Sequence, residues 1–246
     1  MPEGPSIFIL REEAERFAGR KVLNVNGNSK QDIDRMRGKK IVAVRSWGKH
    51  FLVEFDRFSM RIHFMLFGSY RINEAKDAVP RVSLCFSEGE QLNFYACSLR
   101  FIDEELDSVY DWSGDVMSPA WSPVKARRKL RETPNSFVAD VLLDQDMFAG
   151  VGNIIKNEVL HRIRVHPETQ VRALPPRKLT ELITEARKYS FDFYTWKKAF
   201  VLKKNYQVHT KSVCPRDGQK LAYHKSLGVA KRRAFFCEKC QRNYSA

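Results

Sequence analysis

The first residues of the chain combine two groups that could carry covalent chemistry. Methionine before a small residue is usually excised, and its removal here would expose the secondary amine of Pro2 beside the carboxyl group of Glu3. Such an amine attacks an aldehyde-level sugar carbon and gives a cationic iminium, which draws electrons and promotes elimination. A neighbouring carboxyl group can supply or remove protons. The alternative is that these residues only begin a helix.

Two glycine-containing turns present side chains that could bind phosphate. Gly150-Val151-Gly152 precedes Asn153 at the start of a predicted helix, where backbone N–H groups and an amide side chain can approach an anion. Gly48 precedes Lys49 at the tip of a predicted hairpin. The alternatives are an ordinary glycine turn and a solvated lysine.

Three large apolar residues lie between His63 and Gly68. Met65, Leu66 and Phe67 could form a wedge that enters a base stack if they project from the end of a strand. Packing in the hydrophobic core is the alternative.

The five cysteines do not have the pattern of a disulfide framework, because their number is odd and three are crowded near the C-terminus. Cys85 and Cys97 occupy apolar, strand-like runs and are predicted to be buried core thiols. Cys237 and Cys240 have the spacing of one half of a structural zinc site, and Cys214 lies about 20 residues upstream, where the second half is expected. Reduced cysteines favour a cytoplasmic location.

The fourth ligand of this predicted zinc site is not a cysteine. Asp217 stands at the corresponding offset, and His209 and His224 are imidazole alternatives. Zinc accepts three thiolates with one oxygen or nitrogen, so we predict one structural zinc ion and no organic cofactor. Between the ligands, the basic and aromatic run Lys231–Phe236 suits a DNA backbone or minor groove.

Composition limits the function classes. The chain has 246 residues, which corresponds to one or two domains, and its 43 Lys+Arg against 29 Asp+Glu give a net charge of +14. This excess indicates a polyanionic partner, either nucleic acid or an anionic membrane surface. No apolar run approaches the roughly 18 residues of a membrane span. Acidic residues surround the first apolar stretch, which argues against a signal peptide.

The elements that must position these groups follow from the apolar spacing. Residues 5–18 have helical spacing, and short β-rich runs with turn residues between them extend from about 21 to 101, which indicates an antiparallel sandwich. After residues 111–123, helical spacing returns in the segments 138–142 and 154–163 and in a helix over about 178–194.

Taken in this order, the motifs resemble the formamidopyrimidine-DNA glycosylase and endonuclease VIII family. The first five residues and the block Leu143–Glu158 are the most specific parts, and the resemblance covers nearly the whole chain. It implies an α+β fold in three parts: an N-terminal helix with a two-layered antiparallel β-sandwich (1–112), a helix-two-turn-helix domain (113–205) and a C-terminal zinc-finger β-hairpin (206–246).

The resemblance also implies residue roles. Pro2 would be the Schiff-base nucleophile and Glu3 the general acid/base, with Lys49 completing the catalytic group. The residues that it assigns to contact with DNA are Lys49, His63, Asn153 and Arg232, with Met65, Leu66 and Phe67 as the intercalating wedge.

The implied activity is that of a bifunctional DNA glycosylase and AP lyase, which flips out an oxidised base and cuts the strand by β,δ-elimination. Its partner would be damaged double- or single-stranded DNA, and the protein a monomer of bacterial type associated with the nucleoid. Ser6 stands where many members carry glutamate, and the short, lysine-rich stretch Trp196–Tyr206 replaces a long glycine-rich loop. These departures favour the endonuclease VIII branch and oxidised pyrimidines. The alternatives are a catalytically silent module that binds damaged DNA and a glycosylase for 8-oxoguanine or formamidopyrimidines.

Overall fold

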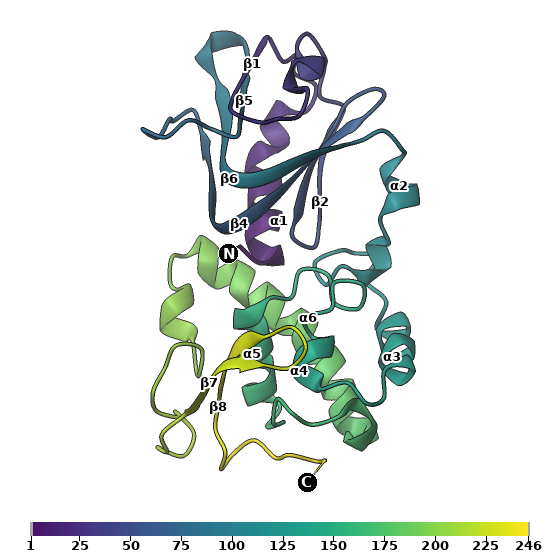
Figure 1. The fold of residues 1–246 in the computed structure, drawn as a ribbon, viewed down its shortest axis with the longest axis vertical. Coiled ribbons are helices and arrows are strands. Elements are labelled where there is room, and N and C mark those ends of the chain that lie inside the picture. Colours follow the sequence, from purple (N-terminus) through teal and green to yellow (C-terminus); the bar gives the residue numbers. More distant parts are fainter. Residues whose placement is uncertain (1, 246) are drawn as a thin grey trace. The chain divides into compact units, whose positions relative to one another are not determined.

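The computed structural model describes residues 2–245, and the chain divides into two compact units that meet in sequence between Asp111 and Trp112 (Figure 1). None of the helices in residues 2–245 is both long and apolar enough to cross a membrane. The separate division of the second unit into a helical domain and a finger stays a prediction.

The first unit begins with helix α1 (Gly4–Ala14), which continues into a short 3-10 turn, η1 (Glu15–Phe17). Pro5 lies in its first turn, where a missing N–H costs no helical hydrogen bond. Ile7, Leu10 and Phe17 are buried in the core, and α1 packs against the strands β2 and β3. The predicted helix over residues 5–18 is confirmed.

Six antiparallel strands follow, in the spatial order β1-β5-β6-β4-β3-β2. Their bounds are β1 (Asn24–Asn26), β2 (Ala43–Trp47), β3 (His50–Glu54), β4 (Ser59–Ile72), β5 (Val82–Cys85) and β6 (Gln91–Ile102). The short helices of this unit are η2 (Ile33–Met36), η3 (Ser87–Gly89) and α2 (Leu106–Val109).

The two longest strands, β4 and β6, each take part in both layers of the sandwich. One layer contains β2 and β3, and the other contains β1 and β5. The first half of β4 pairs with β3 and with the second half of β6, whereas residues 69–72 of β4 pair with the first half of β6. The register shifts between Phe64 and Ser69, and Ala96 opposite the shift has a left-handed φ of +46°. A Cβ on Gly68 would lie 2.7 Å from the Phe64 side chain and 2.8 Å from the Ala96 carbonyl oxygen. Glycine is therefore required where β4 bends.

The layers close on an aromatic core. The ring centroids of Phe51 on β3 and Phe94 on β6 are 5.5 Å apart, and that of Phe64 lies 6.2 Å from Phe94. The predicted antiparallel sandwich is confirmed. Cys97 is buried as predicted, but the prediction for Cys85 is wrong: it ends β5 and is half-buried, with its sulfur 3.8 Å from the Asn26 side chain.

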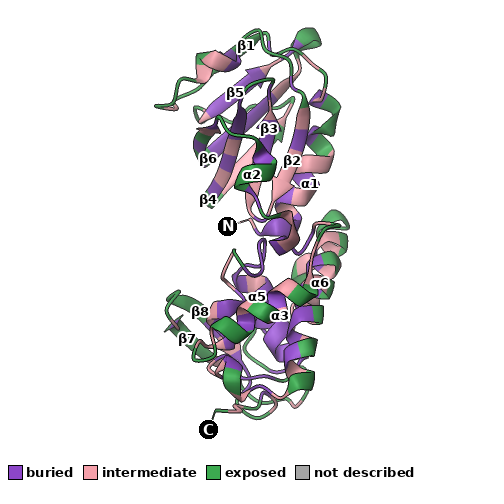
Figure 2. Cartoon of the chain, turned by 90° about the vertical axis from the view of Figure 1, so that its right-hand side faces the viewer, coloured by how far each residue is buried: buried purple, intermediate pink, exposed green. Residues whose placement is uncertain are grey.

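The second unit is a helical bundle with one hairpin. Its elements are η4 (Trp112–Gly114), α3 (Pro123–Glu132), α4 (Val138–Val141), α5 (Asn153–Arg162), η5 (Val171–Ala173), α6 (Pro176–Lys198), η6 (Leu202–Asn205), β7 (Ala222–Leu227) and β8 (Arg232–Phe236). Helix α5 packs against both α6 and β8. Figure 2 shows α5 largely buried and β7 largely exposed.

Candidate functional site

Pro2 and Glu3 lie side by side at the start of α1. Pro2 is half-buried, and Glu3 is only 3% exposed. The Glu3 backbone oxygen accepts hydrogen bonds from the amides of Ser6 (2.8 Å) and Ile7 (3.3 Å), so the helix begins on main-chain bonds. The positive end of a helix stabilises a carboxylate at this position. Glu3 is thus the N-cap residue of α1 and has a buried side chain, and the half-buried Pro2 directly precedes it.

Lys49 is presented by a two-residue hairpin loop. Trp47 and His50 pair across β2 and β3, and Gly48 adopts a left-handed φ of +53°, which favours glycine. Lys49 itself is half-buried. The structure places it at the tip of a hairpin, as predicted.

Two histidines lie close to Lys49 in the sequence or the sheet: His50 begins β3, and His63 lies opposite it on β4. His50 and His63 face each other with ring centroids 5.3 Å apart, and His50 Nδ1 lies 3.2 Å from the hydroxyl of Tyr110. Burial, together with the charges of Arg61, His63 and Lys49, lowers the pKa of His50 to about 3. Burial also lowers the pKa of His63. The lowered pKa favours the neutral imidazole at both positions.

The wedge residues are exposed. Met65, Leu66 and Phe67 have 56%, 60% and 83% of their surface accessible, which excludes the core-packing alternative. They lie within β4, at the shift in register, because the strand pairs again with β6 from Ser69 onward. The prediction that they end a strand is wrong, since a shift inside a strand leaves no turn residues in the sequence to mark it.

In the second unit, Gln145 shapes the turn that presents Asn153. Its side-chain amide donates to the carbonyl oxygens of Leu143 (2.7 Å) and Val151 (3.1 Å), and its oxygen accepts from the Gly150 amide (3.1 Å). Asn153 then begins α5, and among residues 2–245 no group bonds its buried Oδ1 atom. Sequence reasoning did not assign Gln145 this role, although the residue lies in the most specific motif.

Buried charged residues of α5 hold both the hairpin and the chain that leads into it. The Nζ of Lys156, 1% exposed, donates to the Arg233 carbonyl oxygen at 3.0 Å. Burial raises the pKa of Glu158, against the effect of three main-chain donors. Those donors to its carboxylate are the amides of Gln207 (2.9 Å), Val208 (3.0 Å) and His209 (2.7 Å). Sequence reasoning missed both roles, and the only signal was the polar residues that interrupt the apolar spacing of this helix.

Arg232 is exposed at the start of β8, next to a hairpin tip that Asp140 holds. The two carboxylate oxygens of Asp140 accept from the amides of Val229 and Ala230, each at 3.1 Å. Gly228, with φ +68°, lies directly against this carboxylate, and a Cβ there would clash with it. Asp140 comes from α4, far away in the sequence, which is why spacing did not reveal it.

Three thiols and one carboxylate meet next to this hairpin. The ligand atoms of Cys214, Asp217, Cys237 and Cys240 all lie within 4.8 Å of one another. The Sγ atoms of Cys214 and Cys240 are 3.8 Å apart, and the Cys237 thiol donates to Asp217 Oδ2 at 3.2 Å. This cluster could hold a metal ion.

Neither alternative histidine belongs to the cluster that the structure describes. His209 Nδ1 lies 3.0 Å from the side-chain nitrogen of Asn157, and the His224 ring packs edge-on against Phe236 with centroids 5.1 Å apart. The structure thus places Asp217 with the thiols and both histidines elsewhere.

The donor set fits zinc. Burial raises the pKa of the Cys237 thiol to about 12 and also raises that of Cys240. A divalent cation deprotonates such thiols on binding, and three sulfurs with one oxygen make a tetrahedral set that zinc accepts. The Arg216 guanidinium, which donates to Cys240 Sγ at 3.0 Å, would add a compensating charge to a thiolate site.

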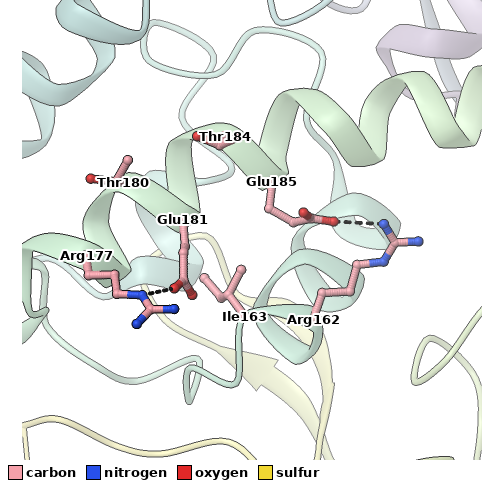
Figure 3. Close-up of a pocket in the computed structure, with 7 residues that line it drawn as sticks. All are labelled: Arg162, Ile163, Arg177, Thr180, Glu181, Thr184 and Glu185. Atoms are coloured by element: carbon pink, nitrogen blue, oxygen red, sulfur yellow. Dashed lines mark hydrogen bonds and ion pairs between the residues drawn. The ribbon is translucent and has the colours of Figure 1, made fainter.

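A surface pocket between α5 and α6 carries no comparable chemistry. Its charged groups neutralise one another, because Arg162 pairs with Glu185 at 2.8 Å and Arg177 with Glu181 at 3.1 Å (Figure 3). The residues that line it are Arg162, Ile163, Arg177, Thr180, Glu181, Thr184 and Glu185.

Comparison with known proteins agrees with this arrangement. The family model for the formamidopyrimidine-DNA glycosylase N-terminal domain matches residues 1–98, and that for the H2TH domain of the same glycosylases matches residues 115–189. The chain belongs to the formamidopyrimidine-DNA glycosylase and endonuclease VIII family.

Its curated relatives include endonuclease 8-like proteins, in agreement with the predicted branch. The chain is 30% identical to endonuclease 8-like 3 of Xenopus laevis over 90% of its own length and 38% of that protein's. It is 32% identical to endonuclease 8-like 2 of Bos taurus over 76% of its length and 59% of that protein's. The chain thus spans less than two thirds of these relatives. A viral DNA glycosylase of known structure shares the fold, with a TM-score of 0.85 and 19% identity over 98% of this chain and all of that one.

Proposed function

We propose that this protein is a DNA glycosylase and AP lyase of base excision repair that releases oxidised bases, with pyrimidines preferred. The observation that carries the proposal is the half-buried Pro2 directly before the buried Glu3, which caps α1, in a chain of this family. Binding alone would need neither an N-terminal amine nor a buried carboxyl group beside it.

The chemistry begins once Met1 is removed. The Pro2 nitrogen forms a bond to C1′ of the deoxyribose, and the bond from C1′ to the damaged base breaks, with its electron pair and a proton going to the base. The bond between C1′ and the ring oxygen O4′ then breaks, with its electron pair and a proton going to O4′, and C1′ and the Pro2 nitrogen form an iminium. This iminium makes the C2′ proton acidic. Loss of that proton breaks the C3′–O bond, and a second elimination breaks the C5′–O bond. Glu3 exchanges the protons that these steps release and require, and water hydrolyses the iminium to restore the amine.

Base flipping supplies the substrate. It costs a few kcal/mol, least for a damaged base, and the exposed side chains of Met65, Leu66 and Phe67 would fill the gap and offset the lost stacking. Lys49 on the first unit, and Asn153 and Arg232 on the second, would hold the flanking phosphates. A zinc ion on the Cys214, Asp217, Cys237 and Cys240 cluster would fix the hairpin that carries Arg232. We propose that the protein is of bacterial type, located in the cytoplasm and associated with the nucleoid.

Borohydride trapping with a panel of duplexes tests this function, each duplex carrying one oxidised pyrimidine, an 8-oxoguanine or an abasic site. We expect a covalent adduct, formed fastest with oxidised pyrimidines and lost in Pro2→Gly or when Met1 is retained. Faster release of 8-oxoguanine would instead indicate the purine-type activity.

The second candidate function is a catalytically silent module that binds damaged DNA. Ser6 favours it, because this first-turn position carries glutamate in many family members and here offers only a hydroxyl group. Tight binding to abasic-site DNA, with no adduct on any duplex of the panel, would decide for this candidate.

A further inference from the structure

Phe200 occupies a backbone position that normally belongs to glycine. It follows the last residues of α6, where its amide donates to the Lys197 carbonyl oxygen at 3.1 Å and the Val201 amide donates to that of Trp196 at 2.9 Å. These two bonds form a Schellman motif, whose first residue beyond the helix cap takes a left-handed conformation. Phe200 has a φ of +58° there.

Phenylalanine at this position does not stabilise the fold. A bulky side chain in the left-handed region is strained, whereas glycine is not. Packing does not compensate for the strain, because the Phe200 residue is 96% exposed. An exposed aromatic ring held in an unfavourable conformation indicates a functional role.

The sequence on either side of Phe200 is rich in cations and has no acidic residue. Four exposed lysines lie within four residues of it, and no aspartate or glutamate occurs between positions 193 and 216. The four lysines are Lys197, Lys198, Lys203 and Lys204. A flat aromatic surface beside several cations suits a polyanion that also offers ring faces.

We propose that Phe200 is a stacking platform for an unpaired base of DNA, with the neighbouring lysines holding the adjoining phosphates. The inference rests on the proposed function for the identity of the polyanion as DNA. In an intact duplex the faces of a base are covered by its neighbours, so an exposed ring can stack only on an unstacked base, in a single strand, a bubble or a frayed end, or flipped out of the helix. An anionic membrane is the weaker alternative, because the adjacent Val201 and Leu202 are half-buried and one ring alone would enter the lipid.

The test compares Phe200→Gly and Phe200→Tyr with the unaltered protein. The probes are a fluorescent oligothymidylate and a strand of equal length built from reduced abasic units, with affinity read from fluorescence anisotropy. Phe200→Gly should weaken binding to the oligothymidylate about 5- to 150-fold, the range for loss of one aromatic–base stack. The same variant should bind the baseless strand as the unaltered protein does, and Phe200→Tyr should keep full affinity for both.

Phe200→Gly should also raise the melting temperature, since glycine relieves the left-handed strain. A variant that is more stable yet binds less tightly cannot owe its defect to misfolding. Val124→Ala is the matched control, because it shortens an apolar side chain on α3 at a residue that is 78% exposed. It should change the affinity for neither strand.

Equal affinity of Phe200→Gly and the unaltered protein for the oligothymidylate would overturn the inference. Loss of binding to phosphatidylserine vesicles, with unchanged binding to the oligothymidylate, would overturn it in favour of a membrane surface. The borohydride adduct reports separately on the proposed function, because it depends on Pro2 and not on Phe200.

Discussion

Glu3 differs from the other acidic residues of the first helical segment in its surroundings. Glu3 is buried at the N-cap of α1, whereas Glu12 is half-buried and Glu13 and Glu15 are exposed further along. A carboxyl group shielded from water next to a nucleophile can exchange protons with a reacting sugar without competition from solvent. The same Glu→Gln substitution at a buried and at an exposed position therefore tests whether burial beside Pro2 matters.

Glu3→Gln should reduce base release by about 10²- to 10⁴-fold, the usual contribution of a general acid/base, with little change in affinity for the same duplex. Single-turnover assays of base release, with binding measured in parallel, check this prediction. Glu15→Gln is the control and should keep the wild-type rate, because the exposed Glu15 side chain pairs with Arg11 on the surface of the helix. Equal loss in both variants would remove the special role of Glu3.

His50 should make stability depend on pH. Its pKa is about 3 in the folded state and 6.5 as a model value, mainly through burial, with Arg61, His63 and Lys49 adding to the effect. The unfolded chain therefore binds a proton first, so the stabilisation is complete above pH 6.5 and is lost as the pH falls toward 3. The loss amounts to at most about 1.4 kcal/mol per pH unit.

Urea unfolding between pH 7.5 and 4.5 measures this dependence. His50→Gln should give a flatter curve, and His224→Gln, which alters an exposed histidine, should keep the slope of the unaltered protein. Parallel curves for His50→Gln and the unaltered protein would contradict the assignment.

The hairpin β7–β8 is held at two places, by the cysteine–aspartate cluster at its base and by Asp140 at its tip. The cluster determines whether the protein binds a metal ion, and the Asp140 contacts determine the shape of the hairpin tip. These two functions should be separable by substitution.

Asp217→Ala should lower the bound zinc below one equivalent, because it removes one of four donors from the cluster. Elemental analysis of purified protein measures the content. His209→Ala is the control and should retain a full equivalent, since His209 bonds Asn157 instead. Full zinc in Asp217→Ala would show that the carboxylate is not a ligand.

Gly228→Ala should weaken DNA binding about tenfold while leaving zinc content unchanged. The added Cβ displaces the Asp140 carboxylate, and two hydrogen bonds to the tip are lost, which corresponds to about 1–3 kcal/mol. Gly89→Ala is a matched control, because Gly89 has a similar φ of +73° with no atom within 4 Å of the added methyl group. An equal loss of affinity in both variants would assign the effect to backbone strain alone.

At the scale of the whole molecule, the net charge of +14 attracts DNA as a whole, and particular residues contact individual phosphates. Lys49 and Arg232 are cations at the proposed phosphate contacts, Asn153 is neutral, and burial keeps the pKa of His63 low. Each class should leave its own mark on the salt dependence of binding.

Affinity for duplex DNA should fall steeply with salt. Lys49→Ala and Arg232→Ala should each reduce the slope of log K against log salt by about one, because each removes a neutralised phosphate. Asn153→Ala should weaken binding at every salt concentration with the slope unchanged. Titrations from 50 to 200 mM salt, the range over which such slopes are usually about linear, distinguish the two patterns. A slope that Lys49→Ala leaves unaltered would place that lysine away from the phosphates.

Local patterns were sufficient to predict the first helix, the Gly48–Lys49 hairpin and the group of thiols with Asp217. Each depends on residues close in sequence or on a known ligand spacing. Other features depend on contacts between distant segments. The bend within β4 needs Ala96 and Gly68 to meet, and the hold on the hairpin tip needs Asp140 to reach residues about ninety positions away. Periodicity carries no information on such pairs.

The bend shared by β4 and β6 makes the two layers of the sandwich inseparable. Because each of these strands donates main-chain hydrogen bonds in both layers, opening either layer breaks the ladder of the other. Amide protons of β3 and of β5 should therefore exchange with deuterium through one common opening event, at the same free energy. The two layers and the hairpin that presents Lys49 would then gain or lose order together, which makes this part of the proposed active site as durable as the sheet itself.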